Sequence, residues 1–213
     1  MNRTHIINIL AKKITAETYL EIGVRDHTLN YDKINVNQKV GVDPAREVCD
    51  RVPTFKLTSD EFFAMNNDTF DLIFIDGLHE ANQVERDILN SLDVLNEGGY
   101  IVCHDMNPVV YERQLLLHDP KRYEYVSREK QKGNPAYGLW NGDCWKAFVS
   151  LRNQRDDIEM LTVDTDYGVG IIQHGTQSKL NLAADEITYD NLEKNRTSWL
   201  NLISTTEFTK KYE

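Results

Sequence analysis

Short apolar runs alternate with longer amphipathic stretches along the first half of the chain. The clearest run is FDLIFID, residues 70–76, which is almost continuously apolar until its final aspartate. Such a run predicts a strand buried on both faces, as in a parallel sheet. The residues after it predict a helix, because Val84, Ile88 and Leu92 fall on one helical face. Strands alternating with helices predict an α/β fold built on a parallel sheet.

The same reasoning divides most of residues 1–175 into elements. The pattern predicts an amphipathic helix over 1–16 and a helix over 143–153. In 54–63 a weak strand gives way to a helix start, with Thr58 or Ser59 as N-cap. The glycines of 96–99 are expected to end the helix that follows 70–76. The remaining predicted strands are 18–24, 39–44, 100–105 and a hairpin of two strands over 158–174.

Two segments depart from this alternation. Residues 107–140 hold three prolines and many aromatic and charged residues, so we expect an excursion over one edge of the sheet that binds the substrate. Its aromatic side chains offer faces that stack on sugar rings or planar molecules. Residues 176–213 are polar, and we expect a tail that is helical across 188–203 and packs on the domain of residues 1–175. The aromatic residues of the excursion are Tyr111, Tyr123, Tyr125, Tyr137 and Trp140.

Composition narrows the classes of function. The chain has 213 residues, of which 40% are hydrophobic, which is enough for the core of one large domain. A formal net charge of −10 disfavours nucleic-acid binding, which needs a basic surface. The apolar runs are too short for a membrane span, and the N-terminus does not resemble a signal peptide. The three cysteines, Cys49, Cys103 and Cys144, lack metal-site spacing and favour a reduced, cytoplasmic protein. Monomer and homo-oligomer both stay open.

Acidic residues follow four of the predicted strands. Asp26 lies just beyond the first, and Asp43, Asp76 and Asp105 end three others. A single aspartate at such a place is commonly a solvated turn residue. Parallel sheets, however, bind ligands outside the carboxyl ends of their strands, and these four residues share that edge. Together they predict a ligand site.

The first of these turns limits the kind of cofactor. It contains a single glycine, Gly23, where a dinucleotide-binding turn requires G-x-G-x-x-G. Asp43, at the end of the second strand, can accept hydrogen bonds from both hydroxyls of a ribose. A ribose-binding acid without a phosphate loop suggests a nucleoside cofactor that lacks a diphosphate, and S-adenosyl-L-methionine fits that description.

The segments YLEIGV, KVGVDP and FDLIFIDGLHEANQVERDILNSLDVLNEGGYIVCHD resemble the class I S-adenosylmethionine-dependent methyltransferases. They are most similar to a subgroup whose fourth strand ends in I-D-G-x-H and whose fifth ends in H-D. The resemblance covers about residues 15–175 and includes LWNGDCWKAFVSLR and DYGVGII. It implies a Rossmann-like fold, with a seven-stranded, mostly parallel sheet, an antiparallel last strand and helices on both faces. His27 stands where this family often has a second glycine, so the loop of residues 24–30 departs from the family pattern.

The resemblance also implies cofactor-binding roles for named residues. Glu21 and Gly23 would border the methionine half of S-adenosyl-L-methionine. Asp43 would bind the ribose hydroxyls. Ser59 and Asp60 would lie beside the adenine, with the Asp60 carboxylate as an acceptor for its amino group.

The remaining candidates concern the reaction. Asp76 would lie beside the sulfonium and the acceptor, and His79 would take the proton of an acceptor hydroxyl. The alternative for His79 is that it only caps the following helix. Asp76, His104 and Asp105 are candidate ligands of Mg²⁺ or Mn²⁺, whereas His104 and Asp105 could also be an ordinary polar strand end. Reactions with and without a metal both stay open.

The predicted function is the transfer of a methyl group to a hydroxyl of a sugar or glycan. The resemblance alone favours a carbohydrate acceptor over a phenolic or other small-molecule acceptor. A third alternative is an α/β binding domain that has kept the fold and lost the chemistry. The altered loop of residues 24–30 favours that alternative, and the presence of Asp43, Asp76, His79 and Asp105 opposes it.

Overall fold

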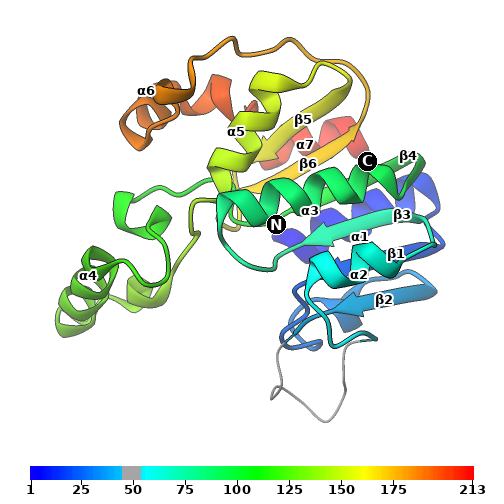
Figure 1. Cartoon of the computed structure of the whole chain (residues 1–213), viewed down its shortest axis with the longest axis horizontal. Coiled ribbons are helices and arrows are strands. Elements are labelled where there is room, and N and C mark those ends of the chain that lie inside the picture. Colours follow the sequence, from blue (N-terminus) through cyan, green and yellow to red (C-terminus); the bar gives the residue numbers. More distant parts are fainter. Residues whose placement is uncertain (45–53) are drawn as a thin grey trace.

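The computed structural model describes residues 1–44 and 54–213, which contain a seven-stranded sheet with the order β2-β1-β3-β4-β6-β5-β7 (Figure 1). Strand β6 is antiparallel to both of its neighbours, and the other pairs are parallel. The strands are β1 (Thr18–Ile22), β2 (Gln38–Val42), β3 (Phe70–Ile75), β4 (Leu95–Cys103), β5 (Ile158–Val163), β6 (Val169–His174) and β7 (Leu202–Ile203).

Helices cover both faces of this sheet (Figure 1). Because side chains alternate along a strand, Leu72 and Phe74 of β3 pack with α1 and α7, while Ile73 and Ile75 face α3 and α5. This arrangement confirms the predicted fold class, a mostly parallel seven-stranded sheet with one antiparallel strand. That strand is β6 and not the last one, because β7 follows it and pairs in parallel with β5. The helices are α1 (Arg3–Ile14), α2 (Ser59–Met65), α3 (Ala81–Asp93), α4 (Pro120–Gln131), α5 (Cys144–Gln154), α6 (Tyr189–Trp199) and α7 (Thr205–Tyr212).

The register of the central strands aligns their carboxyl ends. Ile22 of β1 is paired with Val42 of β2 and with Ile75 of β3, and Ile75 is paired with Cys103 of β4. The next residue of each strand therefore emerges at the same edge of the sheet. These residues are Gly23, Asp43, Asp76 and His104.

Two predictions near these strands were wrong in detail. Residues 54–57 do not form a strand, because Phe55 makes only one isolated bridge, to Val42, before Thr58 caps α2 in a capping box with Glu61. Residues 96–99 do not end a helix, since α3 stops at Asp93 and β4 already begins at Leu95.

The tail of residues 176–213 is not only helical. The helix predicted over 188–203 ends at Trp199, whose carbonyl accepts a hydrogen bond from Arg152 Nη1 at 2.7 Å. The chain then adds β7 beside β5 and finishes in α7. Trp199 and Phe208 are buried, so α6 and α7 contribute to the two opposite cores of the sheet.

The excursion of residues 107–140 leaves the sheet after β4. It contains two short 3₁₀ turns, Tyr111–Gln114 and Pro135–Gly138, and between them α4, which lies to one side of the sheet (Figure 1). Within the described ranges, no helix has the length and apolar character that crossing a membrane requires. Cys103 and Cys144 are free and buried, and Cys49 lies outside the described residues.

Candidate functional site

A cavity of about 930 Å³ opens at the carboxyl edge of the sheet. It is lined by residues that follow β1, β2, β3 and β4, by Arg3 of α1, and by Leu117, Trp140 and Tyr167 from later segments. The structure therefore brings every predicted site residue into one cavity. These residues are Glu21, Gly23, Asp43, Ser59, Asp60, Asp76, His79, His104 and Asp105.

Gly23 allows the ends of β1 and β3 to approach each other. Its φ is +90°, and a Cβ atom built on it would lie 2.2 Å from the carbonyl oxygen of Asp76. Only glycine has no Cβ to clash there. Its N–H donates to the carbonyl of Val42 at 2.8 Å, so this glycine brings all three strand ends together.

Glu21 lies at the inner wall of the cavity and is 1% exposed. Its carboxyl group accepts hydrogen bonds from the Tyr19 hydroxyl at 2.5 Å and from Asn30 Nδ2 at 3.0 Å. Burial raises the pKa of Glu21 to about 7, although these two hydrogen bonds oppose the shift. A group with such a pKa can gain or lose a proton near neutral pH when a charged ligand arrives.

Asp43 holds the loop that the sequence marks as unusual. Its carboxylate accepts a hydrogen bond from the backbone N–H of Arg25 at 2.6 Å, and Arg25 has a φ of +47°. His27 pairs with Asp32 at 2.6 Å and does not line the cavity. Asp26 accepts from the N–H and hydroxyl of Thr28 within its own turn, so of the four strand-end acids it is the one outside the cavity lining.

Ser59 and Asp60 lie at the first turn of α2 and line the cavity. Gln83 Nε2 of α3 donates to the Ser59 hydroxyl at 3.1 Å and to the Asp60 carboxylate at 3.0 Å. Hydrogen bonds from Gln83 and Arg86 lower the pKa of Asp60, so its carboxylate is an anionic acceptor. Ser59 and Asp60 thus line the same cavity as Asp43.

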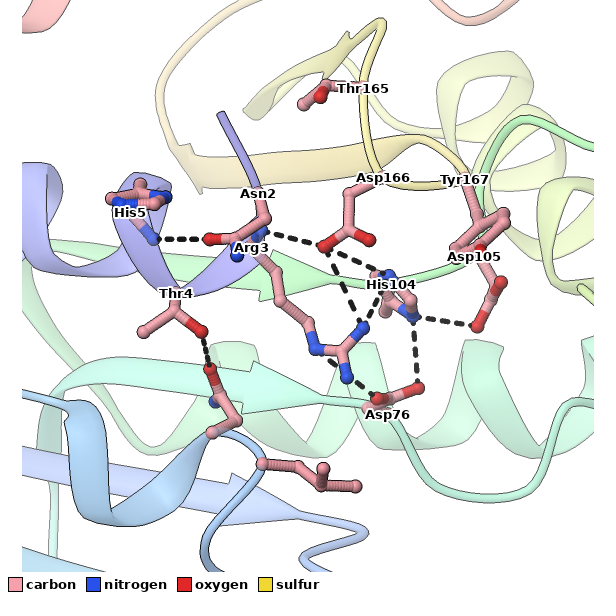
Figure 2. A network of polar contacts seen from close by, with 12 residues as sticks. Asn2, Arg3, Thr4, His5, Asp76, His104, Asp105, Thr165, Asp166 and Tyr167 are labelled. Atoms are coloured by element: carbon pink, nitrogen blue, oxygen red, sulfur yellow. Dashed lines mark hydrogen bonds and ion pairs between the residues drawn. The ribbon is translucent and has the colours of Figure 1, made fainter.

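Two imidazoles and two carboxylates meet in the centre of the site. His79 Nε2 lies 3.3 Å from Asp76 Oδ1 and 3.4 Å from Asp105 Oδ2. His104 Nδ1 lies 3.3 Å and 2.8 Å from the same two oxygens. Figure 2 shows His104 between Asp76 and Asp105. Asp76 Oδ1 and Asp105 Oδ2 therefore each contact both histidines.

These contacts set the charges of the centre. Burial favours a neutral Asp76, but the His104 charge and hydrogen bonds from His104 and His79 hold the pKa of Asp76 below its ordinary value. Burial likewise lowers the pKa of each histidine, and the facing carboxylates outweigh it. The pKa of His79 is raised by Asp76 and Asp105, and that of His104 is raised further by Asp76, Asp105 and Asp166. The centre therefore stabilises imidazolium.

Arg3 and Asp166 complete this network, and the sequence analysis missed both (Figure 2). The backbone N–H of Arg3 donates to Asp166 Oδ2 at 2.8 Å, and Arg3 Nη1 lies 3.0 Å from His104 Nε2. Asp166 Oδ2 lies 3.7 Å from Arg3 Nη1 and 3.6 Å from His104 Nε2. When His104 is protonated, this carboxylate lies between two cations and balances both.

The topology of the fold could have identified Arg3 and Asp166 as candidate site residues. Helix α1 leads directly into β1 and packs against the sheet, so its N-terminus lies at the carboxyl edge (Figure 1). The turn between β5 and antiparallel β6 lies at that edge too, because β5 runs parallel to the central strands. A search of both helix starts and hairpin turns at this edge would have included Arg3 and Asp166.

The excursion reaches the centre through Trp140. Its indole stacks on the imidazole of His79, with ring centroids 4.7 Å apart and planes 23° apart. Among the aromatic residues predicted to bind substrate, Trp140 is the one that lines the cavity; Tyr111, for example, packs edge-on against Tyr189 at 5.4 Å. Tyr167, from the β5–β6 turn, also lines the cavity.

The centre has a donor set suited to a divalent cation. One ligand atom each from Asp76, His79 and Asp105 lies within 4.8 Å of the others, a compact group among the described residues. His104 contacts the same carboxylates, and its second nitrogen faces Asp166, whereas His79 Nδ1 is buried without a hydrogen-bond partner. A ligating histidine normally donates its other N–H to an acceptor, so this orphaned atom favours His104 over His79 as the nitrogen ligand.

Known proteins resemble this chain in sequence and in fold. Residues 18–106 match a family model described as Methyltransferase domain. No curated protein sequence matches the chain.

Solved structures share the fold. The S-adenosylhomocysteine-bound methyltransferase PaMTH1 of Podospora anserina is 17% identical, with a TM-score of 0.52 over 79% of this chain and 76% of that one. The cofactor-bound protein Rv0187 from MTB is 13% identical, with a TM-score of 0.52 over 83% and 82%. An O-methyltransferase from Bacillus cereus in complex with S-adenosylhomocysteine is 14% identical, with a TM-score of 0.50 over 82% of each chain. At these identities the similarity shows a common fold.

Proposed function

We propose that this chain is an S-adenosylmethionine-dependent O-methyltransferase that acts on a hydroxyl of a small molecule. The observation that carries the proposal is that one cavity is lined by Asp43 and Glu21 and also by His79 and Asp76. The methyltransferase-domain match over residues 18–106 supports it, and so do structural neighbours crystallised with S-adenosylhomocysteine.

The cofactor would lie along the carboxyl edge. Glu21 and Gly23 would border its methionine half, Asp43 would accept hydrogen bonds from its ribose hydroxyls, and Ser59 and Asp60 would lie beside its adenine. All five of these residues line the same cavity. Asp76, which directly follows β3, would then face the sulfonium and the acceptor.

In the reaction, the acceptor oxygen forms a bond to the methyl carbon as the bond between that carbon and sulfur breaks. His79 takes the hydroxyl proton in its neutral form, with Nε2 unprotonated; because the facing carboxylates raise the pKa of His79, this form and the transfer rate increase as the pH rises through that pKa. The carboxylates of Asp76 and Asp105, at 3.3 Å and 3.4 Å, orient the ring and stabilise the imidazolium that forms. The products are the methyl ether and S-adenosylhomocysteine, with the proton held on His79.

A divalent cation fits the same centre. Asp76 and Asp105 would hold it, with His104 Nδ1 as nitrogen ligand; the second nitrogen of His104 lies 3.0 Å from Arg3 Nη1 and 3.6 Å from Asp166 Oδ2. Carboxylate oxygens suit Mg²⁺, and the nitrogen suits Mn²⁺. When bound, the cation would lower the pKa of the acceptor hydroxyl and orient it.

For the acceptor we propose a hydroxyl of a sugar or glycan. Two features support this class: the resemblance of I-D-G-L-H and H-D to sequences that act on sugars, and the Trp140 indole on the cavity wall, since aromatic rings stack on sugar faces. The net charge of −10 disfavours anionic polymers as substrates. A phenolic acceptor would fit the same indole and is the rival in the test below.

The decisive experiment has a binding arm and a transfer arm. S-adenosylhomocysteine should raise the melting temperature of the chain, because a ligand that binds only the native state stabilises it by mass action. Transfer of labelled methyl from S-adenosylmethionine should then be measured on matched panels of glycosides and phenols. Binding without transfer to either panel would indicate a binding domain, and transfer confined to phenols would overturn the carbohydrate acceptor.

A further inference from the structure

Residues Trp140-Asn141-Gly142-Asp143 connect the second 3₁₀ turn of the excursion to α5. They belong to the motif LWNGDCWKAFVSLR, and apart from the proposed stacking of the Trp140 indole on the acceptor they take no part in the proposed reaction. Each of the four contacts a different part of the centre. We propose that residues 140–143 are a clamp that positions His79 and Asp105 for methyl transfer, an inference that rests on the proposed function.

Trp140 fixes the plane of the His79 ring. The two rings stack at 4.7 Å, and the indole is itself held because Trp140 Nε1 donates to the carbonyl of Leu115 at 2.7 Å. His79 Nδ1 is buried and has no hydrogen-bond partner among the described residues. Because no hydrogen bond to Nδ1 fixes the orientation of the imidazole, stacking on the indole fixes it instead.

Gly142 packs directly on the backbone of His79. It has a φ of +61°, and a Cβ atom built on it would lie 1.9 Å from the His79 carbonyl oxygen and 2.5 Å from its Cβ. No side chain fits in that space, so glycine is required for the contact. The N–H groups of Asn141 and Gly142 both donate to the carbonyl of Arg113, at 3.0 Å and 3.1 Å, which anchors the segment.

Asp143 caps the helix that starts beside His79. Its Oδ1 accepts a hydrogen bond from the N–H of Ala81 at 2.7 Å, whereas the helix's own N-cap residue, Glu80, makes no side-chain capping bond. Lys146 Nζ holds the other oxygen of Asp143 at 3.2 Å. The start of α3 is thus fixed by a carboxylate far away in the sequence. The negative charge of this carboxylate also interacts favourably with the positive end of the helix dipole.

Asn141 holds the other side of the centre. It is 1% exposed, and its Nδ2 donates to the carbonyls of Asp105 at 3.4 Å and Tyr167 at 3.1 Å. Asp105 and Tyr167 both have a φ of +67°, a left-handed conformation that residues with side chains adopt only when their surroundings impose it. Asn141 therefore helps to keep Asp105 in the conformation that directs its carboxylate at both histidines.

The clamp of residues 140–143 connects the excursion to the groups proposed to carry out methyl transfer. One continuous segment contacts the ring of His79, its carbonyl, the helix start next to it and the backbone of Asp105. The same segment is the end of the excursion that carries Leu117 and Leu139 to the cavity wall. Its residues act through His79 and Asp105 and are positioning residues.

The test compares Trp140→Ala with Trp140→Phe. The alanine variant should lower kcat roughly 10- to 100-fold, the cost of a misplaced catalytic group, and should leave the dissociation constant of S-adenosylhomocysteine unchanged. The phenylalanine variant keeps an aromatic face and should recover most of kcat. Wild-type kcat in Trp140→Ala, or equal loss in both variants together with weaker cofactor binding, would overturn the clamp.

A second variant tests the cap. Asp143→Ala should lower kcat, whereas Thr188→Ala, which removes the side-chain cap of α6 from the N–H of Asn191, should not. Equal kcat values in the two variants at equal melting temperatures would count against positioning by Asp143.

A readout without turnover separates this inference from the proposed function. The ring protons of His79, assigned with a His79→Gln variant, should shift in the NMR spectrum when Trp140→Ala removes the indole's ring current. The shift is measured at one pH, with Trp199→Ala as the control. Absence of methyl transfer by the wild-type protein would refute the proposed function, while an unchanged His79 signal in Trp140→Ala would refute the clamp.

Discussion

Asp43 and Glu21 are two carboxyl groups on one cavity with different surroundings. Asp43 accepts a backbone hydrogen bond from Arg25 and follows β2 directly, whereas Glu21 is enclosed by Tyr19 and Asn30. Burial raises the pKa of Glu21 to about 7. We therefore expect Asp43 to bind cofactor hydroxyls and Glu21 to respond to pH.

Asp43→Ala should weaken the binding of S-adenosylhomocysteine and leave the chain folded. The loss of a charged acceptor for hydroxyl groups costs about 1.5–3 kcal/mol, or roughly 10- to 150-fold in affinity. Isothermal titration calorimetry measures the affinity, and circular dichroism checks the fold. An unchanged affinity would remove the ribose-binding role from Asp43.

His79→Ala should lower turnover by roughly 10²-fold or more at neutral pH, because the acceptor proton loses its base. Cofactor affinity should be nearly unchanged. Single-turnover methyl transfer and calorimetry together measure the two effects. If this variant transfers methyl at the wild-type rate, His79 is not the base and has only a structural role before α3.

Glu21→Gln should change the pH dependence of stability. The pKa of Glu21 is about 7 in the folded chain and 4.5 ordinarily, so between these values the native state binds more protons than the unfolded state. Stability therefore falls as pH rises through this range, and glutamine removes the loss. The variant should exceed wild type at pH 8 by up to about 3 kcal/mol in free energy of unfolding, and by much less at pH 5.

Urea denaturation at the two pH values measures this difference. Glu97→Gln is the matched control, because Glu97 is exposed. A Glu21→Gln variant that gains no stability at pH 8 relative to pH 5 would contradict the raised pKa.

At the scale of elements, strand ends, helix starts and one hairpin turn meet at the carboxyl edge of the sheet. Strands β1 to β4 end there, α1 and α3 begin there, and the β5–β6 turn closes it. The C-terminal elements act at a distance, since β7 extends the sheet beside β5 and α7 covers the face that α1 also covers. The tail therefore supports the sheet that carries the site.

Phe208→Ala should destabilise the chain by about 3–5 kcal/mol, the usual cost of removing a buried phenyl ring. Phe208 of α7 is 0% exposed and packs in the core between the sheet and α1. Phe63→Ala, which truncates a half-buried ring of α2, is the control and should cost less. Equal unfolding free energies for the two variants in urea titrations would show that α7 is dispensable for the sheet.

At the scale of the whole molecule, acids exceed bases, with 34 Asp and Glu against 24 Lys and Arg. In the centre, by contrast, Asp76, Asp105 and Asp166 face Arg3 and two histidines whose pKa values are raised. The centre therefore balances its negative charge internally and can accept a cationic cofactor or a metal ion in exchange for protons.

Treatment with EDTA should lower methyl transfer, and Mg²⁺ or Mn²⁺ should restore it. The reason is the donor set of Asp76, Asp105 and an imidazole. His104→Ala should reduce the response to added metal more than it reduces the affinity for S-adenosylhomocysteine. Full activity in EDTA would leave His79 as a base that works without a metal.

The sequence alone determined the central strands, the helices between them and the acids at the strand ends. These follow from local periodicity: the apolar run of 70–75 and the helical face of Val84, Ile88 and Leu92 each need only neighbouring residues. Parallel pairing then places Gly23, Asp43, Asp76 and His104 at one edge without further information. The fold and most of the cavity's inner walls could therefore be predicted.

The tertiary structure alone decided which groups face one another across that edge. Arg3 meets Asp166, Trp140 stacks on His79, and Asp143 caps Ala81, in each case across a long stretch of sequence. Strand β7 is likewise too short to show a period of its own and exists because β5 offers it a free edge. Local patterns record how a segment is buried, but the direction of a side chain toward a distant partner depends on how whole elements pack.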